Sequence, residues 1–85
     1  MKLILFTYPN CPKCESLKEC LKETDLEWTV YNLVNKEGRL RIREFLKVLN
    51  RDDTGGIIIP TLILKEGEHT TVLNSREELK RRLND

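Results

Sequence analysis

The segment KLILFTYPNCPKC, residues 2–14, changes its hydrophobic pattern part-way along, and the predicted fold is built around that change. Residues 2–8 form an apolar, strand-like run that ends at a Pro-Asn pair. From Cys11 to about Asp25 the apolar residues recur every three or four positions, as they do on one face of a helix. The sequence therefore predicts a strand that leads directly into a helix, with the two cysteines of the CPKC motif at the junction.

The segments that follow predict a second strand and a second helix. Residues 28–33 are rich in β-branched and aromatic side chains, which favour a strand. Residues 35–50 place their apolar side chains on one face of a helix. A strand, a helix and a second strand in this order predict a parallel pair joined by a right-handed crossover.

The last third of the chain predicts a hairpin and a closing helix. The nearly unbroken apolar run over residues 57–64 is typical of a strand buried on both faces, and a turn at residues 66–68 leads into another strand over 69–73. Asn74 or Ser75 can then cap a final helix. The complete order, βαβαββα, predicts an α/β fold in which a four-stranded mixed sheet carries helices on both faces.

Length and composition indicate one folded domain over residues 1–85. Hydrophobic residues make up 39% of the chain and charged residues 34%, which matches neither a disordered nor a membrane protein. The net charge of +1 offers no global field to nucleic acid or to an anionic membrane, so we expect neither as a partner. The apolar start of the chain is too short for a signal peptide or a spanning helix, and we expect a cytoplasmic protein.

The CPKC motif suits the N-terminus of a helix. If Cys11 is the N-cap, Pro12 falls at the first helical position, where its fixed φ suits the helix and its missing N–H is not needed. The sulfur of Cys11 would then face the amides of Lys13 and Cys14, and the helix dipole would favour its thiolate form. We therefore expect Cys11 to be the reactive thiolate.

Cys14 lies one turn farther along, on the apolar face of the same helix. Residues three apart on a helix have Cβ atoms about 5–6 Å apart, and the non-helical cap can bend toward its partner to form a disulfide. A more buried Cys14 would remain a thiol while Cys11 is a thiolate. The pair thus divides into an attacking and a resolving cysteine, and thiol–disulfide exchange is the reaction that we expect.

Other interpretations of the cysteines remain open from the residues alone. They could be small core residues, or the motif could belong to a binding module that holds a metal or cluster, or docks a partner, without redox turnover. A structural zinc site needs four ligands, and beyond Cys20 and His69 the chain offers no second pair at ligand spacing, so we expect no metal. Cys20 is interpreted as a core residue beside Leu17 and Leu21.

Pro60 interrupts the apolar run of residues 57–64, although a central strand normally excludes proline. The strand can begin at Thr61, with Pro60 closing the preceding loop. A cis Ile59–Pro60 bond would in addition turn the chain sharply and leave backbone groups of Ile59 free for an incoming peptide. Both interpretations can hold together.

The chain resembles the glutaredoxin family and its thioredoxin-fold relatives along nearly its whole length. The matching features are the CPKC motif after the first strand, the sequence Ile59-Pro60-Thr61 at the start of the third strand, and a final helix after the hairpin. The resemblance implies a thioredoxin fold and a dithiol–disulfide oxidoreductase that works without a cofactor in electron transport and cell redox homeostasis. It assigns attack on the substrate disulfide to Cys11 and resolution of the mixed disulfide to Cys14. It also implies that the cis-proline loop binds the substrate backbone.

Two positions depart from the pattern that is common in glutaredoxins. Tyr8 stands where a basic residue, three places before the first cysteine, commonly contacts a glutathione carboxylate. Asn74 and Ser75 replace the Gly-Gly pair that precedes an acidic residue at the start of the last helix. Asn74 and Ser75 could still cap the γ-glutamyl carboxylate, and Lys13 or the basic residues of the second helix could replace the lost cation. Glutathione and a flavin-dependent thioredoxin reductase therefore both remain candidate electron donors.

We expect the substrates to be disulfide-bearing proteins. We also expect this protein to act as a monomer. Lys13 could raise the thiolate fraction of Cys11, and Tyr8 could line the substrate groove or simply pack at the strand end. A basic stripe on the second helix would favour an acidic protein partner if it is more than solvated surface. Its members are Lys36, Arg39, Arg43 and Lys47. The candidate substrate-binding residues are Tyr8, Ile59, Pro60, Thr61, Asn74 and Ser75.

Overall fold

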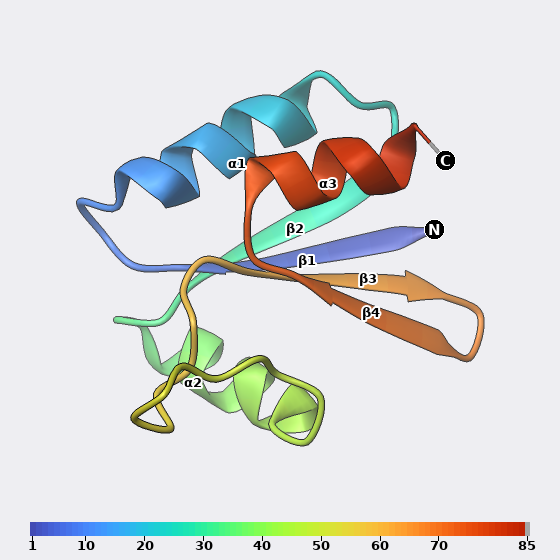
Figure 1. Ribbon diagram of the computed structural model, residues 1–85. Coiled ribbons are helices and arrows are strands. Elements are labelled where there is room, and N and C mark those ends of the chain that lie inside the picture. Colours follow the sequence, from blue (N-terminus) through green and yellow to red (C-terminus); the bar gives the residue numbers. More distant parts are fainter. Residues whose placement is uncertain (85) are drawn as a thin grey trace.

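The computed structural model describes residues 1–84 as alternating strands and helices (Figure 1). The elements are β1 (Lys2–Thr7), α1 (Pro12–Lys22), β2 (Glu27–Asn32), α2 (Lys36–Ile42), a 3₁₀ turn (Arg43–Phe45), β3 (Thr61–Glu66), β4 (His69–Leu73) and α3 (Arg76–Leu83). None of the helices in this range is long and apolar enough to cross a membrane. The order of the elements is the predicted βαβαββα.

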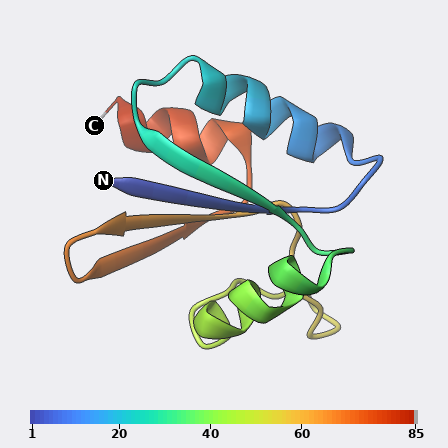
Figure 2. The same ribbon diagram turned by 180° about the vertical axis from the view of Figure 1, so that it is seen from behind.

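Within the described residues, the strands form one sheet of four in the order β2-β1-β3-β4. β1 runs parallel to β2 and antiparallel to β3, and β4 completes the predicted hairpin with β3. α1 and α3 lie on one face of this sheet and α2 lies on the other, as the two opposite views show (Figure 1, Figure 2). The predicted mixed sheet with helices on both faces is confirmed.

The central strand β1 is buried on both faces because each face meets a helical layer. Leu3 and Leu5 belong to the cluster that includes side chains of α1 and α3, whereas Ile4 and Phe6 belong to the cluster that includes side chains of α2. Successive residues of a strand point to opposite faces, so a strand in this position needs an unbroken apolar run. The two clusters together fix the end of β1, where the cysteine loop begins.

The third strand begins later than the apolar run predicted. β3 starts at Thr61, while Ile57 forms an isolated antiparallel bridge with Arg51. Pro60 has no N–H to donate to a neighbouring strand, which explains why the regular strand starts after it. The Ile59–Pro60 bond is cis, so the start of the strand at Thr61 and the cis bond hold together, while the binding of a peptide by Ile59 stays a prediction.

The second helix is shorter than predicted. α2 ends at Ile42 and tightens into the 3₁₀ turn, whereas the sequence pattern predicted one helix over residues 35–50. Phe45 and Leu49 are nevertheless buried in the cluster on this face of the sheet. A spacing of three residues fits a 3₁₀ turn as well as an α-helix, so hydrophobic periodicity could not distinguish the two.

Gly38 allows α2 to approach the end of β2 closely. A Cβ atom at this position would overlap the backbone carbonyl of Asn32, so a larger residue requires a shift of the backbone. The next residue, Arg39, donates from its guanidinium to the carbonyl oxygens of Leu33 and Val34, at 3.4 and 2.5 Å. The first turn of α2 is therefore tied to the segment that follows β2.

Candidate active site

The first cysteine caps α1 in the way that the motif predicts. Cys11 has extended backbone angles (φ −114°, ψ 102°), and its Sγ accepts a hydrogen bond from the Cys14 amide at 3.1 Å. Pro12 occupies the first helical position. The sulfur therefore lies at the positive end of the helix dipole with an N–H directed at it. This environment stabilises a thiolate more than a thiol.

Cys11 and Cys14 pair as a disulfide, with Cα atoms 5.2 Å apart. This separation lies inside the range of about 4.4–6.8 Å that protein disulfides adopt. Cys14 is fully buried, whereas Cys11 is half-buried at the end of the helix. The two sulfurs are thus unequal, because an external disulfide has access to Cys11 and not to Cys14.

The loop before the helix reverses direction at Asn10. This residue has a φ of 57°, in the left-handed region that asparagine tolerates better than most residues. The turn leads the chain from the end of β1 to the cap of α1. Tyr8, two residues earlier, is 49% exposed and lies at the edge of a pocket.

Side chains from outside the cis-proline loop hold that loop in place. Asn74 Nδ2 donates to the carbonyl oxygens of Ile58 and Pro60 at 3.2 and 3.0 Å. Thr61 Oγ1 donates to the same Ile58 oxygen at 2.5 Å. Asn50 Nδ2 in turn donates to Asn74 Oδ1 at 2.6 Å. Asn74 therefore clamps the loop to the end of β4.

These bonds bear on the predicted substrate-binding residues. The side chains of Thr61 and Asn74 face the protein's own backbone, so any effect on a substrate would act through the position of the loop. Ile59 and Tyr8 instead line an open pocket together. Asn50 was not predicted, because nothing in the sequence relates it to a residue 24 positions away.

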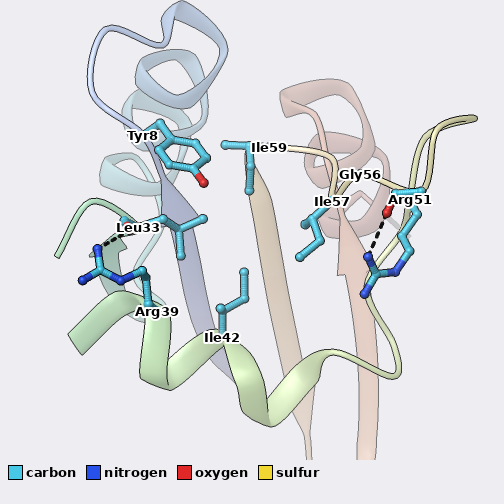
Figure 3. A pocket seen from close by; sticks show the side chains of 9 residues that line it. Tyr8, Leu33, Arg39, Ile42, Arg51, Gly56, Ile57 and Ile59 are labelled. Atoms are coloured by element: carbon cyan, nitrogen blue, oxygen red, sulfur yellow. Dashed lines mark hydrogen bonds between the residues drawn. The ribbon is translucent and has the colours of Figure 1, made fainter. Parts of the chain in front are cut away.

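Two pockets in the described part of the chain are lined by residues on either side of Cys11. The cis-proline pocket has a volume of about 350 Å³, and Tyr8 and Ile59 line it with residues of α2 and the loop after it (Figure 3). The α3 pocket has a volume of about 280 Å³, and its lining includes Lys13 and Asn74. The cysteine loop thus lies beside the cis-proline loop on one side and the N-terminus of α3 on the other.

The α3 pocket is built around a second helix cap. Ser75 has extended backbone angles, and its Oγ accepts from the Glu78 amide at 3.1 Å and donates to the Glu78 carboxylate at 3.3 Å. Of the two predicted capping residues, Ser75 is therefore the cap. Arg76 Nε is buried without a hydrogen-bond partner within residues 1–84. The pocket lining includes the cations Lys13 and Arg76 and the anion Glu77, so one positive charge remains in excess.

The third cysteine lies apart from the CPKC motif. Cys20 is a free thiol, 4% exposed, in the core cluster with Leu17 and Leu21, as predicted. His69 is exposed at the start of β4. Between residues 1 and 84, no three His, Cys, Asp or Glu side chains form a group that could hold a metal ion.

Solved structures of similar shape identify the fold. The thioredoxin-like protein BC3987 has a TM-score of 0.62 at 22% sequence identity, over 95% of this chain and 97% of that one. A single-residue mutant of that protein gives 0.63 at 20% identity, over 98% and 99% of the two chains. Thioredoxin 1 from the thermophilic eubacterium Thermosipho africanus gives 0.61 at 18% identity, over 99% and 96%. At these identities the likeness concerns the fold, and the fold is that of thioredoxin.

A match to a family model identifies the family within the thioredoxin fold. The model of the family Glutaredoxin matches residues 3–70, a range that contains the CPKC motif and the cis-proline. The chain therefore belongs to the glutaredoxin family. None of the curated proteins matches its sequence significantly. The family match ends before Asn74 and Ser75, where the sequence departs from the pattern common in glutaredoxins.

Proposed function

We propose that this protein is a thiol–disulfide oxidoreductase that reduces protein or small-molecule disulfides with the dithiol of Cys11 and Cys14. The observation that carries the proposal is the geometry of the cap. The half-buried Cys11 sulfur accepts the Cys14 amide at 3.1 Å, while Cys14 itself is fully buried within disulfide reach. Membership of the glutaredoxin family supports the same reaction.

In the first step, the thiolate of Cys11 attacks one sulfur of the substrate disulfide. A bond forms between Cys11 and that sulfur as the substrate S–S bond breaks, and the other substrate sulfur leaves as a thiolate that takes up a proton. The helix dipole and the Cys14 amide stabilise the attacking thiolate. Backbone groups of Ile59, next to the cis-proline, align the substrate chain.

In the second step, Cys14 loses its proton and attacks the Sγ of Cys11. The intramolecular disulfide forms, the mixed disulfide breaks, and the second substrate thiol is released. The Cα separation of 5.2 Å places Cys14 within reach of Cys11 without a movement of the helix. Two electrons have then passed to the substrate, and no resident cofactor takes part.

A thiol donor must reduce the Cys11–Cys14 disulfide before the next cycle. Glutathione and a flavin-dependent thioredoxin reductase are the two candidates. The α3 pocket supports glutathione, because Lys13 and Arg76 supply positive charge beside the cap at Ser75, in excess of the one carboxylate of Glu77. A reducing cytoplasm, where we propose that the protein acts as a monomer in cell redox homeostasis, would favour reduction of substrates.

A thiol titration tests the proposed function. The Cys20→Ser variant, in which only the CPKC thiols remain, is equilibrated with graded ratios of reduced to oxidised glutathione, and free thiols are counted by mass spectrometry. We expect two thiols to disappear together and reversibly, at a potential of about −270 to −200 mV. A glutathione adduct on Cys11 would identify glutathione as the donor.

Two results would contradict the proposed function. One is a pair that stays reduced at every glutathione ratio. The other is stoichiometric metal in protein purified without a chelator. Either result would favour a binding module that uses the CPKC motif to hold a metal, a cluster or a partner without redox turnover.

A further inference from the structure

The cis-proline pocket has features that disulfide exchange alone does not require. It extends from Tyr8 and Ile59 to α2 and the loop that follows (Figure 3). We propose that it binds a large apolar side chain of a protein substrate together with a neighbouring acidic group, and so selects the substrates of the dithiol. This inference rests on the proposed disulfide reductase function.

The inner surface of the pocket is apolar. Leu33 and Ile42 contribute from the α2 side, Ile57 and Ile59 from the cis-proline loop, and Tyr8 lies beside Ile59 at the end near the cysteines (Figure 3). Leu33 and Ile42 are buried members of the core, so this wall is fixed. Ile57 and Ile59 are only half-buried, and an apolar side chain of a ligand would cover them.

Two arginines lie at opposite sides of this apolar surface (Figure 3). Arg39 donates to the Leu33 carbonyl, and Arg51 donates to the Gly55 carbonyl at 2.9 Å. Within residues 1–84, neither arginine forms an ion pair, and none of the residues that line the pocket is acidic. A guanidinium has five N–H donors, so both arginines keep donors for an anionic ligand group.

The loop that carries Arg51 is ordered by its own hydrogen bonds. Asp52 Oδ1 accepts from the amides of Thr54 and Gly56, both at 2.9 Å, and from the Thr54 hydroxyl at 2.7 Å. Gly55 has a φ of +86°, which glycine adopts without strain. The carboxylate nearest in sequence to Arg51 is therefore engaged inside the loop. The guanidinium is presented to the pocket from a defined turn.

A protein segment fits this combination better than glutathione does. Glutathione carries carboxylates but no large apolar side chain, so it would leave the exposed surface of Ile57 uncovered. A substrate chain that pairs with the backbone of Ile59 would bring a neighbouring side chain into the pocket. An acidic residue beside it would meet Arg39 or Arg51. The substrate class is therefore a protein disulfide flanked by a large apolar residue and an acidic residue.

Disulfide-bridged peptides test this inference. A Leu-Glu pair is placed in turn at each of the four positions on either side of one cysteine, and matched peptides replace the glutamate by lysine or the leucine by serine. Dithiothreitol regenerates the enzyme, and bis(2-hydroxyethyl) disulfide serves as a small, neutral reference substrate. At the best position, we expect kcat/KM to fall about fivefold for the lysine peptide and about tenfold for the serine peptide.

A charge reversal connects this preference to the pocket. In Arg51→Glu, the preference between the glutamate and lysine peptides should invert, with the lysine peptide now favoured about fivefold. Arg81→Glu is the matched control, since Arg81 is exposed in α3 and does not line the pocket. It makes the same change of net charge and should keep the wild-type preference. A gain with the lysine peptide cannot result from loss of folded protein.

The possible outcomes separate the two proposals. A wild-type protein that reduces bis(2-hydroxyethyl) disulfide but does not distinguish the peptides overturns the pocket inference and leaves the proposed function standing. The same holds if Arg51→Glu and Arg81→Glu show the same preference between the glutamate and lysine peptides. A protein that reduces none of these disulfides overturns the proposed function and the inference with it.

Discussion

The N-termini of α1 and α3 have the same local geometry and different chemistry. Cys11 accepts the amide of Cys14 through sulfur, and Ser75 accepts the amide of Glu78 through oxygen, both at 3.1 Å. At α3, the third residue is Glu78, whose carboxylate accepts a hydrogen bond from the Ser75 hydroxyl. At α1, the third residue is Cys14, whose sulfur pairs with the sulfur of Cys11. The same cap position thus stabilises a helix when it holds oxygen, and forms a disulfide when it holds sulfur.

The residue before each cap extends this comparison, because both are asparagines. Asn10 takes a positive φ and turns the chain toward Cys11. Asn74 instead extends its amide to the carbonyls of Ile58 and Pro60. The N-terminus of α1 therefore holds the cysteine pair, while the N-terminus of α3 supports the cis-proline loop.

The largest effect is expected when the sulfur cap of α1 is replaced by an oxygen cap like that of α3. Cys11→Ser should lower disulfide reductase activity by at least about a thousandfold, because no thiolate remains at the accessible position. The serine can still accept the Cys14 amide, so the free energy of unfolding of the reduced protein should change by less than about 1 kcal/mol. Enzyme assays and urea unfolding measure the two quantities. Full activity in this variant would exclude Cys11 as the nucleophile.

A smaller effect is expected from the asparagine before the serine cap. Asn74→Ala leaves the Pro60 carbonyl without its donor and the Ile58 carbonyl with the Thr61 hydroxyl alone, which should cost about 1–3 kcal/mol of stability. If the clamp positions the loop for substrate, KM should rise about tenfold with kcat nearly constant. Asn50→Ala removes only the outer bond of the network and should have a weaker effect. A loss of stability with unchanged KM would show that Asn74 is structural only.

The serine cap itself should contribute to stability. Ser75→Ala removes the acceptor of the Glu78 amide and should cost about 1 kcal/mol, or about 4–8 °C in Tm. Ser16→Ala makes the same change inside α1, where alanine is the better helix former, and should not lower Tm. Thermal unfolding of both variants measures the difference. Equal losses would show that the cap contributes nothing specific.

The smallest effect is expected for Asp52, whose carboxylate accepts hydrogen bonds inside a turn that does not lead into a helix. Hydrogen bonds from the Thr54 hydroxyl, the Gly56 amide and the Thr54 amide lower the pKa of Asp52 below its usual value of 3.8. Because the folded pKa is the lower one, the stabilisation is complete above about pH 3.8 and is lost as the pH falls through the folded pKa. The stability difference between the wild type and Asp52→Asn should therefore shrink below pH 4. A difference independent of pH would contradict this account.

The sequence was informative wherever the structure depends on neighbouring residues. The cap at Cys11, the burial of Cys14 and the break at Pro60 follow from patterns of a few residues, and each was found as predicted. The parallel pair and the hairpin were found as predicted as well, because a crossover and a short turn leave few arrangements. The end of α2 at Ile42 was missed, since the apolar spacing continues through the 3₁₀ turn.

Contacts between distant residues could not be predicted in this way. The hydrogen bond between Asn50 and Asn74 joins two residues 24 positions apart, and no pattern in either segment predicts it. Arg51 likewise reaches the cis-proline pocket only because Asp52 closes the loop after it. The basic stripe indicated Arg39, but its place in a pocket depends on how closely Gly38 lets α2 approach β2.

The thiol of Cys20 can report when α1 opens away from the sheet. In the oxidised state Cys20 carries the one thiol left unpaired among the three cysteines of the sequence, and it is buried on the face of α1 that packs against the sheet. A thiol reagent can modify it only when that helix moves away from the sheet. The labelling rate of Cys20 in the oxidised and reduced states would therefore show how strongly the disulfide at one end of α1 restrains the whole helix, without any introduced probe.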